Sequence, residues 1–173
     1  MKILGVDPGL STTGYGVISV CDNVHDDTGF ELLEAGIIRT DGARQGVAAR
    51  LRKVHDSLEE LIEDVSPDVL VIEKLFTHYK HPATAILMGH ARGVVCLLSG
   101  TKDIPLVSMP CTHVKKAVTG RGHASKKQVQ RMIQHILGLG RLPEPSDVAD
   151  ALAIAVAYAF NRRLKAKKKK NPE

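Results

Sequence analysis

Short apolar runs alternate with longer amphipathic segments along this chain. Residues 2–7, 14–20 and 31–39 are rich in β-branched and other apolar side chains, and turn-forming or polar residues separate them. This pattern predicts three strands that form an antiparallel meander. Between residues 47 and 65 the apolar side chains instead recur at intervals of three and four, which predicts an amphipathic helix that Pro67 ends.

The second half of the chain continues to alternate between strands and helices. Residues 69–72 are all apolar, which is typical of a strand covered on both faces in a parallel part of a sheet. A further strand is predicted at residues 104–108, and helices are predicted over residues 82–98 and 110–118. Two more helices are predicted, one that begins after a capping box at Ser125 and Gln128 and one that begins after the cap Ser146. This order predicts an α/β fold with a mixed central sheet, an antiparallel meander plus parallel strands, and helices on both faces. We expect a single domain over residues 1–161 and a basic, disordered tail over residues 162–173.

Small residues mark one side of the predicted helix over residues 82–98. Ala85, Gly89 and Gly93 follow one another at intervals of four. Such a stripe lets a second helix approach closely, and it could serve either the core of the domain or a dimer.

The composition fits one compact domain with a core of Val, Ile, Leu and Ala. Apolar residues make up 43% of the 173 residues and aromatic residues only 3%. The cysteines, Cys21, Cys96 and Cys111, are odd in number and widely spaced, so neither a disulfide framework nor a zinc site is indicated. The apolar stretch before Asp7 is too brief for a signal peptide, and residues 151–160 are too few to cross a bilayer. We therefore expect a cytoplasmic protein that does not contact a membrane.

The net charge of +5 hides an uneven distribution along the chain. Residues 1–73 carry 14 acidic and 6 basic side chains, whereas residues 74–141 carry 11 basic side chains and 1 acidic side chain. Seven further bases lie within residues 162–170. A nucleic acid is the simplest partner for this concentration of positive charge, because each neutralised phosphate releases counterions. The alternative is a basic face that serves only solubility.

Four carboxylates stand where predicted strands end or where the last helix begins. Asp7 ends the first strand and Glu73 ends the buried strand. If these two strands are parallel neighbours, their carboxyl ends are adjacent and the two acids lie side by side. Asp147 and Asp150 are three residues apart on the last helix, so they share one of its faces. We expect this face to point toward Asp7 and Glu73.

The clustering of these four acids predicts a divalent-metal site, because like charges in a partly buried site are costly unless a cation compensates them. Oxygen-only ligands suit Mg²⁺, and Mn²⁺ is expected to substitute. Two such ions, about 3.5 to 4 Å apart, can activate a water and stabilise the leaving oxygen of an in-line displacement at phosphorus. The predicted chemistry is phosphodiester hydrolysis, with all four acids as metal ligands and catalytic residues.

Each acid also has a purely structural explanation. Asp147 would interact favourably with the positive end of the helix dipole, and Asp7 would stabilise the Asp-Pro-Gly turn. Glu73 is harder to explain in this way, because glutamate is rarely tolerated beside a fully apolar strand without a partner. The set of four is therefore better evidence for a metal site than any single member.

Aromatic and basic side chains near the acids predict contacts with nucleic acid. Phe76 and Tyr79 follow Glu73 among cations, and an exposed ring there could stack on a base, contributing about 1 to 3 kcal/mol. A core position for Phe76 is equally compatible with the sequence. The glycine-rich loop at residues 119–124 and the helix start after it are surrounded by side chains that could hold phosphate: Lys115, Lys116, Arg121, His123, Lys126 and Lys127.

Over nearly its whole length the chain resembles the RuvC family of Holliday-junction resolvases, within the ribonuclease H-like superfamily. The segments that carry the resemblance are GVDPG at residues 5–9, VIEKLF at 71–76, GHARGV at 89–94, VKKAVTG at 114–120 and DVADALA at 147–153. Several motifs in one order are more specific than any one of them. The resemblance implies a junction-contacting role for Phe76 and phosphate-binding or active-site roles for Lys115 and Lys126. It also implies metal-binding catalytic roles for the four acids, although relatives have either Asp or His at the position that matches Asp147.

The resemblance further implies what such a protein does. Its family members are crossover junction endodeoxyribonucleases that act as homodimers and make paired nicks in four-way junction DNA during recombination and repair. They work beside a branch-migration helicase complex of the RuvA and RuvB proteins. This chain departs from the family pattern in a long polar connection at residues 22–29 and in its terminal lysine run, and both could change DNA affinity or partner contacts.

Three other functions stay open on the sequence alone. Another ribonuclease H-like nuclease could use the same metal chemistry on RNA or on RNA–DNA hybrids. An actin-like phosphotransferase also begins with a strand that ends in Asp-x-Gly, but it needs a second large domain that 173 residues cannot supply. A non-catalytic junction-binding protein would need only the positive middle segment.

Overall fold

The computed structural model describes residues 1–20, 29–40, 45–74 and 82–170. The elements follow one another along the chain as β1 (Lys2–Asp7), β2 (Thr12–Val20), β3 (Phe30–Arg39), α1 (Val47–Val65), β4 (Val69–Glu73), α2 (Pro82–Thr101), β5 (Leu106–Met109), α3 (Cys111–Thr119), α4 (Lys126–Ile136) and α5 (Ser146–Lys170). This order is the one that the hydrophobic pattern predicts. The capping box at Ser125 and Gln128 is also present, at the start of α4.

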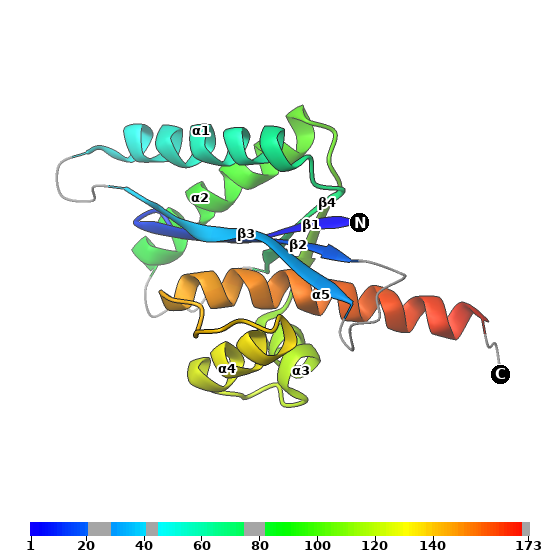
Figure 1. Ribbon diagram of the computed structural model, residues 1–173. Helices are drawn as coiled ribbons and strands as arrows, with labels where there is room; N and C mark the ends of the chain where they lie inside the picture. Colours follow the sequence, from blue (N-terminus) through cyan, green and yellow to red (C-terminus); the bar gives the residue numbers. More distant parts are fainter. Residues whose placement is uncertain (21–28, 41–44, 75–81, 171–173) are drawn as a thin grey trace.

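The described strands form one five-stranded sheet in the order β3-β2-β1-β4-β5. The pairs β1–β2 and β2–β3 are antiparallel, whereas β1–β4 and β4–β5 are parallel. The mixed sheet and the parallel pairing of the first and fourth strands are therefore confirmed. Helices α1 and α2 cover one face of the sheet, and α3, α4 and α5 lie on the other (Figure 1).

Side chains on neighbouring positions of a strand point to opposite faces, and this alternation decides where the acids lie. Leu4 and Val6 of β1 pack in the core beneath α1 and α2, whereas Ile3 packs in the core that contains α5. Asp7 has the same parity as Ile3, and Glu73 has the same parity as Val71, which packs on the α5 side. Both acids therefore lie on the face of the sheet that α5 covers.

Helix α5 approaches the sheet more closely than strand side chains normally permit. A Cβ placed at Gly5 would lie 2.2 Å from the carbonyl oxygen of Ala151, and one at Gly14 would lie 2.1 Å from that of Asp147. At Gly16 it would lie 2.5 Å from the Leu152 side chain. At Gly5 and Gly14 the added Cβ would meet helix backbone, so only glycine fits there, and the N-terminal half of α5 rests directly on β1 and β2.

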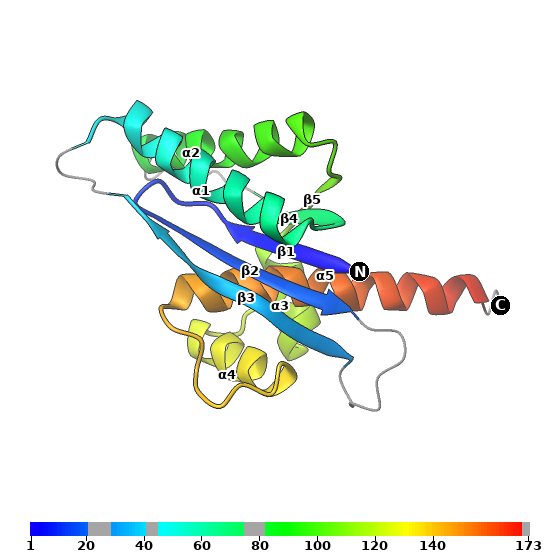
Figure 2. The ribbon, with the colours of Figure 1, turned by 45° about the horizontal axis from the view of Figure 1, so that its top comes forward.

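The end of α5 differs from the sequence prediction. We expected a disordered tail from residue 162, but the helix continues to Lys170 (Figure 2). Lys, Arg, Ala and Leu are all strong helix formers, and cations near the C-terminus of a helix interact favourably with its dipole. Composition alone had suggested disorder because the segment offers little apolar surface to bury.

The close packing of α5 predicts a large effect of one added methyl group. Gly14→Ala should lower the free energy of unfolding by at least about 2 kcal/mol, because the new Cβ must displace helix backbone rather than a flexible side chain. Urea denaturation measures this change. Gly140→Ala is the matched control, since nothing lies within 4 Å of a Cβ there, and it should stay within about 0.5 kcal/mol of the wild type. Equal losses in both variants would contradict the packing explanation.

Candidate active site

Asp7 and Glu73 lie side by side at the carboxyl ends of two parallel strands. The register pairs Val6 with Ile72, so the next residue of each strand is one of the two acids. Asp7 is in turn paired with Gly14 of β2, and the Cβ of Asp147 lies 3.1 Å from the Cβ position of that glycine. The structure thus brings Asp147 over the strand pair that contains Asp7, as the sequence predicts.

The electrostatics of Asp7 show that all four acids share one site. Burial raises the pKa of the Asp7 carboxyl from 3.8 to about 7, and the charges of Asp150, Glu73 and Asp147 add to this rise in that order. Lys126 acts in the opposite direction. The side chains are half-buried, so these charges interact through a medium that screens them less than bulk water does.

The pKa of the Glu73 carboxyl is raised by some neighbours and lowered by others, with a net rise. Burial raises its pKa, and the charge of Asp150 adds to the rise. A hydrogen bond with the Cys111 thiol and the charges of Lys115 and Lys126 lower it. Lys115 on α3 is therefore placed close enough to act on the acid cluster, which agrees with the role that the family resemblance implies for it.

Lys126 makes a direct contact with the cluster. Its Nζ donates a hydrogen bond to Oδ2 of Asp150 at 3.0 Å, and this bond raises the pKa of the lysine. Ser125 and Gln128 cap α4 reciprocally, which fixes Lys126 as the first residue of the helix. With 69% of its side chain exposed, Lys126 can also reach a ligand in solvent.

The other predicted DNA contacts are distributed around the cluster. Lys116 lies on α3, Arg121 on the connection that follows and Lys127 on α4, and all three are exposed. Phe76 and Tyr79 lie outside the described residues. His123 is exposed beside Arg121.

Two residues at the site have no predicted role in the sequence analysis. Arg92 of α2 donates to the carbonyl oxygen of Glu73 at 2.6 Å and to the Ser108 hydroxyl at 2.7 Å, so one guanidinium holds the ends of β4 and β5 together. Cys111 begins α3 and shares a hydrogen bond with the Glu73 carboxylate. Arg92 lies inside the GHARGV motif, which was a signal for its importance, whereas nothing in the sequence marks Cys111.

The chemistry of the acid cluster fits a divalent cation. Within the described part of the chain, no three His, Cys, Asp or Glu side chains stand close enough in their present conformations to hold an ion together. The donor set is nevertheless made of oxygen ligands, and the mutual repulsion that raises the pKa of Asp7 is what a bound cation would relieve.

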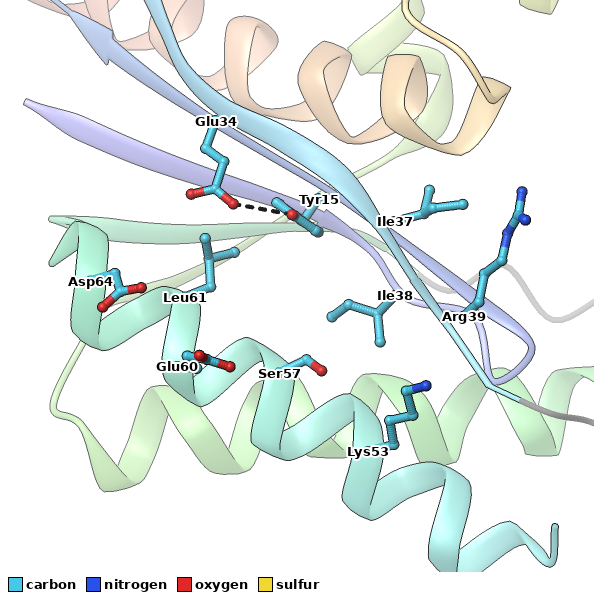
Figure 3. Close-up of a pocket in the computed structure, with 10 residues that line it drawn as sticks. All are labelled: Tyr15, Glu34, Ile37, Ile38, Arg39, Lys53, Ser57, Glu60, Leu61 and Asp64. Carbon is cyan, nitrogen blue, oxygen red and sulfur yellow. Dashed lines mark hydrogen bonds between the residues drawn. The ribbon is translucent and has the colours of Figure 1, made fainter.

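A cavity of about 700 Å³ lies elsewhere, between α1 and the strands β2 and β3 (Figure 3). Figure 3 shows Glu60 and Asp64 of α1 across from Glu34, whose carboxylate accepts a 3.1 Å hydrogen bond from the Tyr15 hydroxyl. The residues that line this cavity include none of the four acids. It opens on the α1 side of the sheet, so we do not assign the hydrolytic chemistry to it.

The raised pKa of Asp7 predicts how the metal-free protein responds to pH. The folded state binds the proton more tightly than the unfolded chain does, so the free energy of unfolding falls as the pH rises from about 4 to about 7. Asp7→Asn removes this penalty. In chelator-treated protein the variant should exceed the wild type by on the order of 2–4 kcal/mol at about pH 8, and the difference should vanish below about pH 4. Denaturant unfolding at both pH values measures this, and a difference that does not change with pH would contradict it.

Known proteins resemble this chain over most of its length. The family model described as crossover junction endodeoxyribonuclease RuvC matches residues 3–158. The RuvC protein of Rhodopirellula baltica is 45% identical over 154 residues, which cover 89% of this chain and 83% of the relative. The structure of Thermus thermophilus RuvC superposes with a TM-score of 0.85 at 32% identity, covering 95% of this chain and 97% of that one.

A second structure of the Thermus thermophilus protein, in complex with a Holliday junction substrate, superposes with a TM-score of 0.86 at 31% identity over 95% of this chain and 96% of that one. The likeness therefore extends over almost the whole fold and is not confined to isolated motifs. The chain belongs to the RuvC family of crossover junction endodeoxyribonucleases, which are metal-dependent nucleases with a ribonuclease H-like fold.

Proposed function

We propose that this protein cuts four-way DNA junctions by metal-dependent phosphodiester hydrolysis at the cluster formed by Asp7, Glu73, Asp147 and Asp150. The observation that carries the proposal is the convergence of these acids from two parallel strand ends and one helix, where burial and the charges of the other three acids raise the pKa of Asp7. Family membership supports a junction as the substrate, and a structure of the Thermus thermophilus relative is in complex with a Holliday junction substrate.

The four acids would hold the divalent cations beside the scissile phosphate. When two Mg²⁺ ions, or Mn²⁺ in their place, are bound, they supply a water activated for attack and stabilisation of the leaving oxygen. The protein holds Asp7 and Glu73 on adjacent strand ends and the two aspartates on a helix packed against the sheet, so the backbone positions of the ligands are set before DNA arrives. Arg92 contributes by fixing the backbone at Glu73.

The surface beside the cluster is suited to the DNA backbone. Lys126 contacts Asp150 in the free protein, and its exposed ammonium group can turn to a phosphate when a cation takes over the acid. Lys115 lies near Glu73. We assign further backbone contacts to Lys116, Arg121 and Lys127, and we assign stacking on bases at the junction to Phe76 from the family resemblance.

We further propose that the protein is a homodimer that pairs through α2. Ala91, Val95 and Leu98 bury one side of this helix in the domain. On the opposite side, 59% of Ile86 and 56% of Leu97 are exposed. A Cβ at Gly89 or Gly93 would meet nothing within 4 Å, so the small-residue stripe is not used by the core of this domain.

A second copy of the chain is a better partner for α2 than a lipid bilayer. By length and composition alone α2 could cross a membrane, and most of it is exposed in the monomer. Its buried side nevertheless packs with α1 and β4 in the core, and crossing a membrane would break those contacts. Two copies of a glycine-lined helix can approach closely and cover the exposed apolar side chains.

The remaining assignments rest on family resemblance. We propose a cytoplasmic location and cooperation with the RuvA and RuvB branch-migration proteins. Cleavage of RNA–DNA hybrids and metal-independent junction binding are the competing activities, because the acids and the basic surface would serve either of them.

Asp7→Asn should abolish junction cleavage while junction binding is kept or strengthened. The change removes a metal ligand and a negative charge beside the phosphate. The assay compares an immobile four-way junction with a linear duplex and an RNA–DNA hybrid of matching sequence, each with Mg²⁺ and with chelator. The wild type should make paired nicks in the junction only with Mg²⁺, and Asp7→Asn should lose at least about a thousandfold in rate.

Two outcomes of this assay would redirect the assignment. Preferential cutting of the hybrid would place the chain in another branch of ribonuclease H-like nucleases. Normal cutting by Asp7→Asn would remove the acid cluster from the chemistry altogether.

Gly93→Glu should convert the protein to a monomer without unfolding it. The position has open space around it in the single chain, whereas a charged side chain there would separate two paired helices. Light scattering coupled to size-exclusion chromatography should show at least a tenfold weaker dimer, and paired nicks should give way to slow single nicks. Gly140→Glu, at another open and exposed glycine away from α2, should remain dimeric. A dimeric Gly93→Glu protein would exclude α2 as the interface.

A further inference from the structure

Near its C-terminal end, α5 contacts β3 through two side chains, and its last turns extend beyond these contacts. The Phe160 ring meets the Phe30 ring edge-on, with centroids 5.3 Å apart. The Arg163 guanidinium lies 4.4 Å above the same Phe30 ring and donates to the carbonyl oxygen of Gly29 at 3.1 Å. Beyond this anchor the helix continues to Lys170, clear of the other elements in both views (Figures 1 and 2).

The part beyond the anchor is strongly basic. Leu164, Lys165 and Ala166 are exposed, and the sequence adds four lysines at residues 167–170. No acidic residue occurs between Asp150 and Glu173, so the helix itself offers these charges no ion-pair partner. One or two cations in the last turn would satisfy the helix dipole, and five lysines exceed that need.

The helix also fixes how far these lysines are from the acid cluster. Lys165 and Lys170 follow Asp150 by 15 and 20 residues on one continuous helix. At a rise of about 1.5 Å per residue, they lie about 22 and 30 Å from it along the axis. In B-form DNA, with about 34 Å per turn of about 10 base pairs, this distance corresponds to about 7 to 9 base pairs.

We propose that the C-terminal lysine segment, residues 165–170, binds the phosphate backbone of one junction arm about 7 to 9 base pairs from the phosphate that the same subunit cuts. The inference rests on the proposed function, because it takes a DNA arm leaving the acid cluster as given. Lys116 and Lys127 belong to α3 and α4, which lie on the same side of the sheet as α5 (Figure 1). A duplex held by these helices stays on the side where the lysine segment projects.

Helix α1, on the opposite side of the sheet, carries an excess of negative charge. Its three bases lie near its start, whereas the acids follow from its middle to its end: Asp56, Glu59, Glu60, Glu63 and Asp64. Lys102 pairs with Glu59 and Glu63, at 2.8 and 2.7 Å, but it offsets only part of this charge. An arm that follows the α5 side passes Lys116, Lys127 and the lysine segment, and avoids the acidic side chains of α1.

The test uses full-length protein that carries Asp7→Asn, so that binding is measured without cleavage. In one variant the five lysines of the segment become Gln, and in the matched control they become Arg. Both residues are good helix formers and leave the Phe30–Arg163 anchor intact. Hydroxyl-radical footprinting on a junction with 15-base-pair arms should show protection about 7 to 9 base pairs from the cleavage site with Lys or Arg, and none with Gln.

Salt dependence and arm length give independent readouts. The slope of log K against log salt should become shallower by about 0.9 for every lysine that engages a phosphate, hence by about 2 to 4 in the Gln variant and not in the Arg control. On a junction whose arms are trimmed to about 6 base pairs and closed by hairpin loops, the Gln variant and its parent should bind alike.

An unchanged footprint and slope in the Gln variant would overturn the proposal, and so would an equal loss of affinity on the trimmed junction. Binding of both variants to vesicles of anionic lipid is measured as well. If the Gln variant keeps the footprint but no longer binds the vesicles, the proposal is overturned in favour of a membrane surface. If the Asp7→Asn parent binds the junction no better than linear duplex, the proposed junction selectivity fails first and this inference fails with it.

Discussion

The contact between the backbone of α5 and the glycines of β1 and β2 determines the geometry of the whole site. Gly5, Gly14 and Gly16 cost strand stability because glycine packs no side chain and is flexible in the unfolded chain. In return, the helix lies directly on the sheet, with Asp147 beside the strand pair that ends in Asp7. A side chain at Gly5 or Gly14 would meet the helix backbone and push the helix away from the sheet, which would separate the two halves of the acid cluster.

This packing holds like charges together against their repulsion. The middle of α5 is almost completely buried, from Ala151 to Ala157, and the apolar area removed from water there stabilises the contact. The acids at the helix start are placed by this distant burial and not by attraction among themselves. Lys126 offsets part of the repulsion, while burial and the remaining repulsion together raise the pKa of Asp7. The start of α5 therefore favours cation binding, although the position of the helix is determined by the burial of its middle.

The sequence predicts those parts of the site that depend on local periodicity. Two features can be seen locally in the sequence: strands end at Asp7 and Glu73, and Asp147 and Asp150 are three residues apart. The assumption that the two strands are parallel neighbours is then enough to predict that the acids lie together. Arg92 and Cys111 could not be assigned roles, because their contacts with Glu73 cross 19 and 38 residues of chain and depend on side-chain packing. The helical end of α5 was missed because composition does not reveal the anchor at Phe30, far away in the sequence.

One side chain of helix α2, Arg92, connects the exposed side of the helix to the acid cluster. The outer side of α2 exposes Gly93 and Leu97, while Arg92, next to that glycine, donates hydrogen bonds to the backbone of Glu73 and to Ser108. A guanidinium that bridges two strand ends has little freedom to move unless both ends move with it. A shift of α2 against the sheet must therefore either break two short hydrogen bonds or displace Glu73. Whatever partner covers the outer side of α2 consequently acts on a helix that is already coupled to one of the four acids.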